Sequence, residues 1–270
     1  MYAMSQAKIG GFAKGRVIER SYSSVGNGAP LLNSFYFRYD IGGQADTTDN
    51  HLNSLMVLPG GNSADLTPNA QNQPASVPDG KIQFMLRDAD PTAAEDEYFF
   101  TLGHSILRDG LAGRRVQLRD VGQAGEIRRD LPGSLFQGPG DKVLGLAGFK
   151  LFYTGERDHH VDEIEVTFIN DDRTLRVGLN DRDNNDVFGY LVDIIVLSRS
   201  PAVTISTGVS RGSATGGDRV ALPPGPSHSE WGIRGFRFGC PSGDRQLREV
   251  GVVKRGSNLE VAAGLQRRWV

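Results

Sequence analysis

Apolar and polar residues alternate along much of the chain. Between residues 163 and 168 the sequence Glu-Ile-Glu-Val-Thr-Phe places an apolar side chain at every second position. A period of two is typical of a β-strand with one buried face. Helical periodicity is weak, and Gly or Pro interrupts most stretches that would be long enough for a long helix. The pattern therefore predicts an all-β fold with little helix.

One strand pattern occurs three times. In each copy a Phe follows Gly or Ser and has an apolar residue three positions before it. Further along, an Asp is followed by apolar residues three, six and eight positions later. These Phe and Asp residues are Phe35 and Asp49, Phe149 and Asp158, and Phe236 and Asp244. Such internal similarity predicts that the fold is built from a degenerate repeated strand unit.

The repeat suggests three units. We expect the first over residues 1–110, the second over 111–200 and a truncated third over 201–270, which lacks the acidic turn of the other two. A polar segment rich in Asn, Pro, Ser and Ala, residues 60–79, reads as a long loop inserted in the first unit. Alternating strands of this kind bury their apolar faces in antiparallel β-sandwiches. The units could share sheets, as approximately threefold packing or as two sandwiches with common strands.

Composition narrows the function classes. The chain has 270 residues, 35 of them Gly, and 38% of its residues are hydrophobic, which fits a folded protein with many turns. Its formal net charge of −2 disfavours a sequence-independent nucleic-acid binder. The N-terminal residues lack the apolar core of a secretory signal, and no run reaches the roughly 18 apolar residues of a membrane span. We therefore expect synthesis in a host cytoplasm and neither nucleic acid nor membrane as a partner.

Motifs of known enzyme classes are missing from the sequence. It contains no G-x-S-x-G nucleophile elbow, no phosphate-binding P-loop and no H-E-x-x-H zinc motif. The prediction is a protein that is not an enzyme, with no catalytic residues. An unfamiliar hydrolase is the weakest alternative, and it would have to depend on the acidic turns.

Two turns are rich in oxygen ligands. Calcium prefers several carboxylate and amide oxygens. We expect no cofactor, with a calcium ion at these turns as the alternative. Asp and Asn also favour turn geometry by themselves, which is the structural alternative. The candidate calcium ligands are Asp88 and Asp90 in the first unit, and Asp181, Asp183, Asn185 and Asp186 in the second.

A second candidate metal or turn site lies where the repeated Asp precedes a strand. Asp158 and His160 alternate in the second unit, as Asp49 and His51 do in the first. Histidine and carboxylate from one strand face can share a metal ion. The third unit has no histidine at this position, which favours a structural role as a turn cap with a locally hydrogen-bonded histidine.

The last residues carry a candidate interface, Arg267, Arg268, Trp269 and Val270. Arg and Trp residues dominate the energetics of many protein interfaces. The same residues could instead guard an edge strand with charge. Because the third unit is incomplete, we also expect an unpaired strand edge that accepts a strand from a neighbouring chain.

These features favour a structural subunit of a large assembly, namely a virion or phage particle, as a capsid decoration, head or tail component. Its partners would be copies of itself and other subunits, and its location the virion. The alternative is a lectin-like carbohydrate-binding module that depends on calcium through its acidic turns. In that case exposed aromatic rings would stack on the sugar, although most aromatic residues of a β-sandwich pack in its core.

Overall fold

The computed structural model is all-β, as predicted. It describes residues 4–14, 17–26, 28–41, 44–45, 51–67, 77–88, 97–108, 113–155, 159–181, 186–199, 205, 207, 218–221, 231–239, 245–255 and 258–267. Within these ranges the one helix is the short 3-10 helix η2 (Gly133–Phe136). No described helix is long and apolar enough to cross a membrane.

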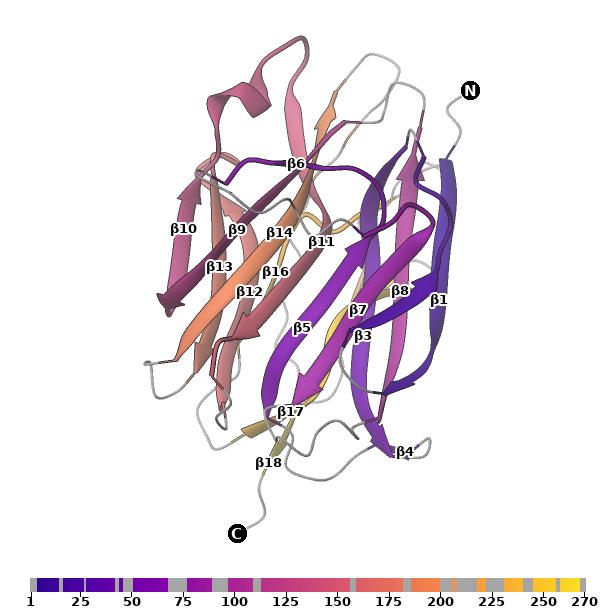
Figure 1. Ribbon diagram of the computed structural model, residues 1–270, viewed down its shortest axis with the longest axis vertical. Helices are drawn as coiled ribbons and strands as arrows, with labels where there is room; N and C mark the ends of the chain where they lie inside the picture. The colour runs from indigo at the N-terminus through magenta and orange to yellow at the C-terminus, as the bar shows by residue number, and fades with distance from the viewer. Residues whose placement is uncertain are drawn as a thin grey trace.

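The strands form three sheets, in which every pairing is antiparallel except that of β6 with β9 (Figure 1). Sheet 1 contains, in spatial order, β1 (Met4–Lys14), β8 (Glu97–Leu107), β3 (Ala29–Ile41), β17 (Arg245–Arg255), β18 (Asn258–Arg267) and β15 (Asp218–Ala221), with β4 (Gln44–Ala45) also paired to β3. Sheet 2 contains β2 (Ile18–Ser21), β7 (Lys81–Asp88), β5 (Leu52–Pro59), β11 (Lys142–Tyr153), β14 (Val187–Ser198), β9 (Arg114–Ala124) and β6 (Ala64–Asp65). Sheet 3 contains β10 (Glu126–Asp130), β13 (Thr174–Asp181), β12 (Val161–Ile169) and β16 (Phe236–Gly239).

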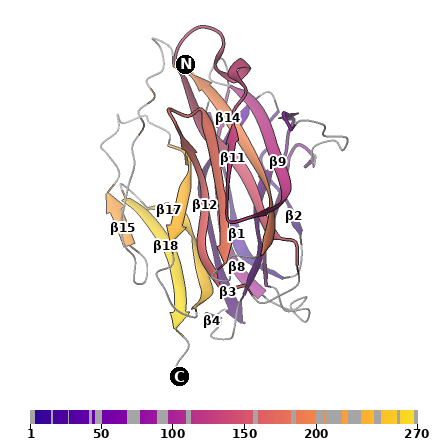
Figure 2. The ribbon, with the colours of Figure 1, turned by 90° about the vertical axis from the view of Figure 1, so that its left-hand side faces the viewer.

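The sheets are layered as in a sandwich. In Figure 1 sheet 2 faces the viewer, and the strands of sheets 1 and 3 lie behind it. Figure 2 shows β15 and β18 on one side of the molecule and β14 and β9 on the other. The apolar faces meet in one large core between the layers. The predicted antiparallel, sandwich-like all-β fold is confirmed.

Each sheet joins strands from two copies of the repeat. In every sheet the repeated Phe of one copy lies opposite a residue of another copy. That residue is the apolar one eight positions after the repeated Asp. These pairs are Phe35 with Val252, Phe149 with Val57, and Phe236 with Val166. Because the same register recurs three times, the copies share sheets in an approximately threefold arrangement. The division of the chain at residues 110 and 200 stays a prediction.

The three repeated Phe rings meet in the core. The ring centroid of Phe35 is 5.1 Å from that of Phe149 and 4.9 Å from that of Phe236, and the latter two are 4.9 Å apart. Their exposed fractions are 0%, 0% and 6%. Tilted and edge-on contacts at these separations are favourable for aromatic rings. One side chain from each copy therefore contributes to a common centre.

Close backbone contact explains the small residue before the repeated Phe. A Cβ atom on Gly148 would lie 2.4 Å from the carbonyl oxygen of Val57, and one on Gly235 would lie 2.6 Å from that of Val166. Real Cβ atoms do not approach oxygen so closely, so glycine lets the strands of two copies meet. The strand after the repeated Asp also bulges at the same place in each copy, between Leu52 and Ser54, Val161 and Glu163, and Leu247 and Glu249.

The outer face of sheet 2 carries part of the predicted inserted loop. Residues 60–67 and 77–79 of this loop are described, and they include β6, which pairs in parallel with β9. The Arg115 guanidinium donates to the carbonyl oxygens of Gly60 and Pro59, both at 2.8 Å. It also forms an ion pair with Asp193, whose side chain is fully buried. This buried cation fixes the start of the loop to the sheet.

Candidate functional site

Three potential metal ligands meet where the chain passes between sheets 2 and 3. Asp181 ends β13, Asp186 directly precedes β14, and His159 lies two residues before β12. Since β12 and β13 are antiparallel with Val161 opposite Asp181, a residue just before β12 lies beside the end of β13. The connection from β13 in sheet 3 to β14 in sheet 2 then brings the second carboxylate to the same place.

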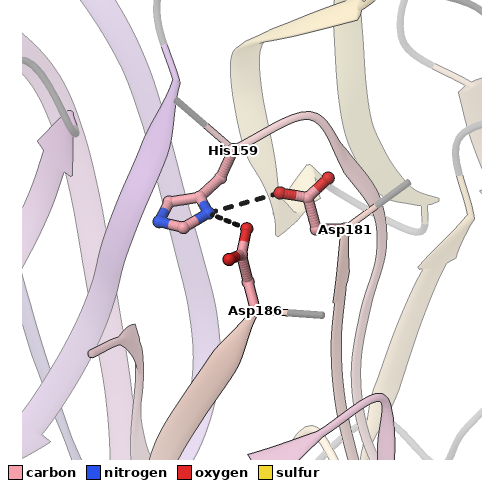
Figure 3. A group of neighbouring side chains, drawn as sticks. All are labelled: His159, Asp181 and Asp186. Carbon is pink, nitrogen blue, oxygen red and sulfur yellow. Dashed lines mark hydrogen bonds and ion pairs between the residues drawn. The ribbon is translucent and has the colours of Figure 1, made fainter. Parts of the chain in front are cut away.

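The imidazole of His159 points between two carboxylates (Figure 3). Its Nδ1 atom lies 3.2 Å from Oδ2 of Asp181 and 2.8 Å from Oδ2 of Asp186. One ligand atom from each of the three residues lies within 4.8 Å of the other two. The side chains of His159 and Asp181 are 1% and 2% exposed, whereas that of Asp186 is 20% exposed. The cluster is thus buried, with one ligand near the surface.

The two carboxylates of this cluster are close enough to repel each other unless a cation lies between them. Two carboxylates whose oxygens lie within 4.8 Å repel each other by about 3 kcal/mol at an effective dielectric constant of about 20. A neutral imidazole with its hydrogen on Nδ1 can donate that one hydrogen but adds no positive charge. Protonation of His159 or binding of a metal ion would remove the repulsion. The arrangement is therefore suited to hold a proton or a metal cation.

Tyr153, the last residue of β11, covers one side of the cluster. Its ring stacks on the His159 imidazole with centroids 3.7 Å apart and an angle of 17° between the planes. Burial raises the pKa of the Tyr153 phenol well above its usual value, and the charges of Asp181 and Asp186 add to the shift. Neither the phenol oxygen nor His159 Nε2 has a hydrogen-bond partner in the described part of the chain. The tyrosine therefore stays neutral and forms an apolar wall that keeps water from the imidazole.

The predicted calcium ligands separate into two places. Asp181 and Asp186 come together at the cluster, whereas Asp183, Asn185 and Asp90 lie outside the described residues. Asp88 ends β7 in sheet 2, at the position in the first copy that Asp181 has in the second. There its Oδ1 accepts a hydrogen bond from the backbone N–H of His51 at 3.0 Å. In the first copy the strand-end aspartate thus caps the start of the neighbouring strand.

Of the second predicted site the structure describes only the two histidines, so its grouping with Asp49 and Asp158 stays a prediction. The rings of His51 and His160 meet edge to face with centroids 5.1 Å apart, while Asp49 and Asp158 lie outside the described residues. The histidine that reaches the carboxylates is His159, which sequence reasoning missed. Alternation along a strand assigned His160 to the ligand face, but β12 begins only at Val161, so the alternation does not extend back to these residues.

Sheet 3 ends differently from the other two sheets. In sheet 1 the strand that carries the repeated Phe is β3, and its spatial neighbour on one side is β8. In sheet 2 the equivalent strand β11 has β14 as its neighbour on that side. In sheet 3 the equivalent strand β16 is the last of the described strands. Its Phe236 and Phe238 side chains are buried, whereas Arg237 and Gly239 are exposed. One backbone edge of β16 has no partner strand in the part of the chain that the structure describes.

The candidate C-terminal interface lies mostly beyond the described residues. Arg267 is the last residue of β18, opposite Arg245 of β17, and residues 268–270 are outside the description.

Comparison of the chain with protein-family models, characterised proteins and solved structures found no match. Its function must therefore be inferred from its own geometry.

Proposed function

We propose that the protein is a structural subunit of a large assembly, a virion or phage particle, in which copies join through strand edges. The observation that carries this proposal is the end of sheet 3 at β16 in the described part of the chain. The corresponding places in sheets 1 and 2 are filled by β8 and β14, with 11 and 12 residues. An unpaired edge presents free backbone donors and acceptors, which favours pairing with another chain.

The fold also indicates what the incoming strand must be like. β14 places Tyr190, Val192 and Ile194 in the large core. Its alternate residues lie on the other face of the sheet, where Leu191 and Ile195 are buried in smaller apolar clusters. A strand added to β16 in the same way would bring apolar side chains at alternate positions toward Phe236 and Phe238. A strand of a second copy, or of another subunit with the same alternation, meets this requirement. As a capsid decoration, head or tail component, the protein would assemble without chemistry of its own.

The mass of the purified protein in solution tests this proposal. Gly239, at the end of β16, is exposed, and a Cβ atom there would have no heavy atom within 4 Å, so alanine fits. Proline at the same position removes a backbone donor and places its ring at the edge. We expect the wild type and Gly239→Ala to form higher-order species by light scattering, and Gly239→Pro to remain smaller.

Two further conditions sharpen the experiment. Higher-order species should survive a calcium chelator, because strand pairing needs no metal ion. Removal of residues 266–270 should reduce them if the C-terminal segment contributes to the interface. A wild-type chain that remains monomeric at all concentrations, or a Gly239→Pro variant that assembles like Gly239→Ala, would contradict the proposal.

A second candidate function is a carbohydrate-binding module that depends on calcium. The convergence of the carboxylates of Asp181 and Asp186 at the turn between β13 and β14 favours it. Such a module would be a monomer or small oligomer that loses thermal stability on chelation and binds glycans on an array only with calcium. Glycan binding that is absent, or that is unchanged by chelation, would count against this candidate.

A further inference from the structure

We infer that His159, Asp181 and Asp186 form a binding site for one divalent transition-metal ion of the zinc class. This inference is independent of how copies of the chain assemble. It differs from the calcium hypothesis because the central ligand is an imidazole nitrogen. Zinc and related ions accept nitrogen together with carboxylate oxygen, whereas calcium takes six to eight oxygens.

The ligand atoms are already spaced nearly as a coordinated metal requires. In a tetrahedral zinc site with bonds of 2.0–2.1 Å, neighbouring ligand atoms lie about 3.3 Å apart. The two separations from His159 Nδ1 are 3.2 Å to Asp181 and 2.8 Å to Asp186. The carboxylate oxygens of these two residues lie within 4.8 Å of each other. The partly exposed Asp186 lies on a connection outside the strands, so a small movement of its side chain would complete the geometry.

The two carboxylates of this cluster suit a divalent metal ion. Protonation of His159 would supply one positive charge between two carboxylates, whereas a divalent ion supplies two. Both states place a hydrogen on Nε2, for which the described part of the chain offers no acceptor, so this feature does not distinguish them. The stacked Tyr153 ring excludes water on one side, which strengthens the attraction between the metal ion and its ligands.

The position of the site in the fold gives it a structural consequence. His159 lies on the connection from β11 to β12, which leads from sheet 2 to sheet 3, and Asp186 lies on the returning connection from β13 to β14. A metal ion held by both would tie these two crossings together. At the position of His159 the first copy has Asn50 and the third has Arg245. The expected stoichiometry is therefore one ion per chain.

Metal titration of the untagged, chelator-stripped chain tests the inference. We expect calorimetry to show one Zn²⁺ bound per chain and the melting temperature to rise on binding. Loss of a partner behind a metal ligand lowers affinity by 10–100-fold, so loss of a ligand itself should raise Kd by at least ~100-fold. His159→Gln and Asp186→Asn should both show this loss. The matched control is His160→Gln, which removes the neighbouring histidine and should bind as the wild type does.

A second readout reports on the ligands directly. Co²⁺ bound in place of Zn²⁺ should give visible absorption bands of a low-symmetry nitrogen and oxygen site, and these bands should vanish in Asp186→Asn. If His159→Gln fails to fold, Asp186→Asn decides, because its side chain is partly exposed and its shape is kept. Zn²⁺ affinity unchanged in Asp186→Asn, or Ca²⁺ bound there more tightly than Zn²⁺, would overturn the inference. Gly239→Pro should bind Zn²⁺ normally, which separates this site from the assembly edge.

Discussion

Replacing Arg115 with methionine should destabilise the fold strongly, because it removes the cation from a buried ion pair. Val116 and Leu118, its neighbours on β9, face the core, so the Arg115 side chain lies on the outer face of sheet 2. There it donates from Nε at 3.0 Å and from Nη2 at 2.5 Å to the carboxylate of Asp193. Nε2 of Gln117 also donates to this carboxylate, at 3.1 Å.

The size of the effect follows from what the substitution leaves behind. Asp193 is fully buried, and removal of one partner of a buried ion pair typically costs about 3–5 kcal/mol. The double variant Arg115→Met with Asp193→Leu removes both charges and should be much less destabilised. It still loses the bonds to the carbonyls of Pro59 and Gly60, which would cost about 1–3 kcal/mol if these groups stay buried.

Urea unfolding followed by circular dichroism measures both free energies. A double-mutant cycle should then give a coupling energy of at least about 2 kcal/mol between Arg115 and Asp193. A loss below about 1 kcal/mol in Arg115→Met would refute the reasoning. So would a double variant whose loss equals the sum of the two single losses, since the pair would then not act as a unit.

Further predictions concern the core, a close contact and pH. Alanine at each repeated Phe should lower the free energy of unfolding by about 3–5 kcal/mol, and a loss below about 1 kcal/mol at any one would contradict a shared centre. Gly148→Ala should cost about 1–3 kcal/mol in the same assay, because its Cβ would overlap the backbone of β5, whereas a neutral result would contradict this contact. Burial lowers the pKa of His104 to about 4. The unfolded state, with a pKa near 6.5, therefore binds more protons between about pH 4 and 6.5, so stability should fall by about 3 kcal/mol as pH decreases through this window. His104→Gln should lose that slope in urea midpoints measured against pH, and a slope equal to that of the wild type would contradict the assignment.

The repeat could be seen in the sequence, but the pairing of its copies could not. The spacing of Phe and Asp fixes which residues of one copy are equivalent to those of another. The spacing does not predict that Phe149 lies opposite Val57 of a different copy, because packing decides the register between distant strands. The glycine before Phe149 was visible as a pattern, and its reason, the nearby carbonyl of Val57, appears only in three dimensions.

Local exceptions to the alternation of buried and exposed residues could not be predicted from the sequence either. The period-two pattern places Glu165 on the polar face of β12, yet this residue is fully buried. Its Oε1 accepts a hydrogen bond from Arg176 Nε at 2.7 Å and from Thr167 Oγ1 at 2.6 Å, so a neighbouring strand covers it. His159 was missed for a related reason, since it precedes the strand and its direction is set by the chain's passage between sheets.

Amide hydrogen exchange of β16 is the most direct test of the claim that copies join at the edge of sheet 3. Peptides that cover residues 236–239 should exchange faster in dilute protein than those of β3 and β11, the equivalent strands with neighbours on both sides. We predict that their exchange slows as concentration rises and higher-order species form, in the wild type and in Gly239→Ala but not in Gly239→Pro. Assembly that leaves exchange at residues 236–239 unchanged would contradict the account, and so would full protection of β16 in the isolated monomer.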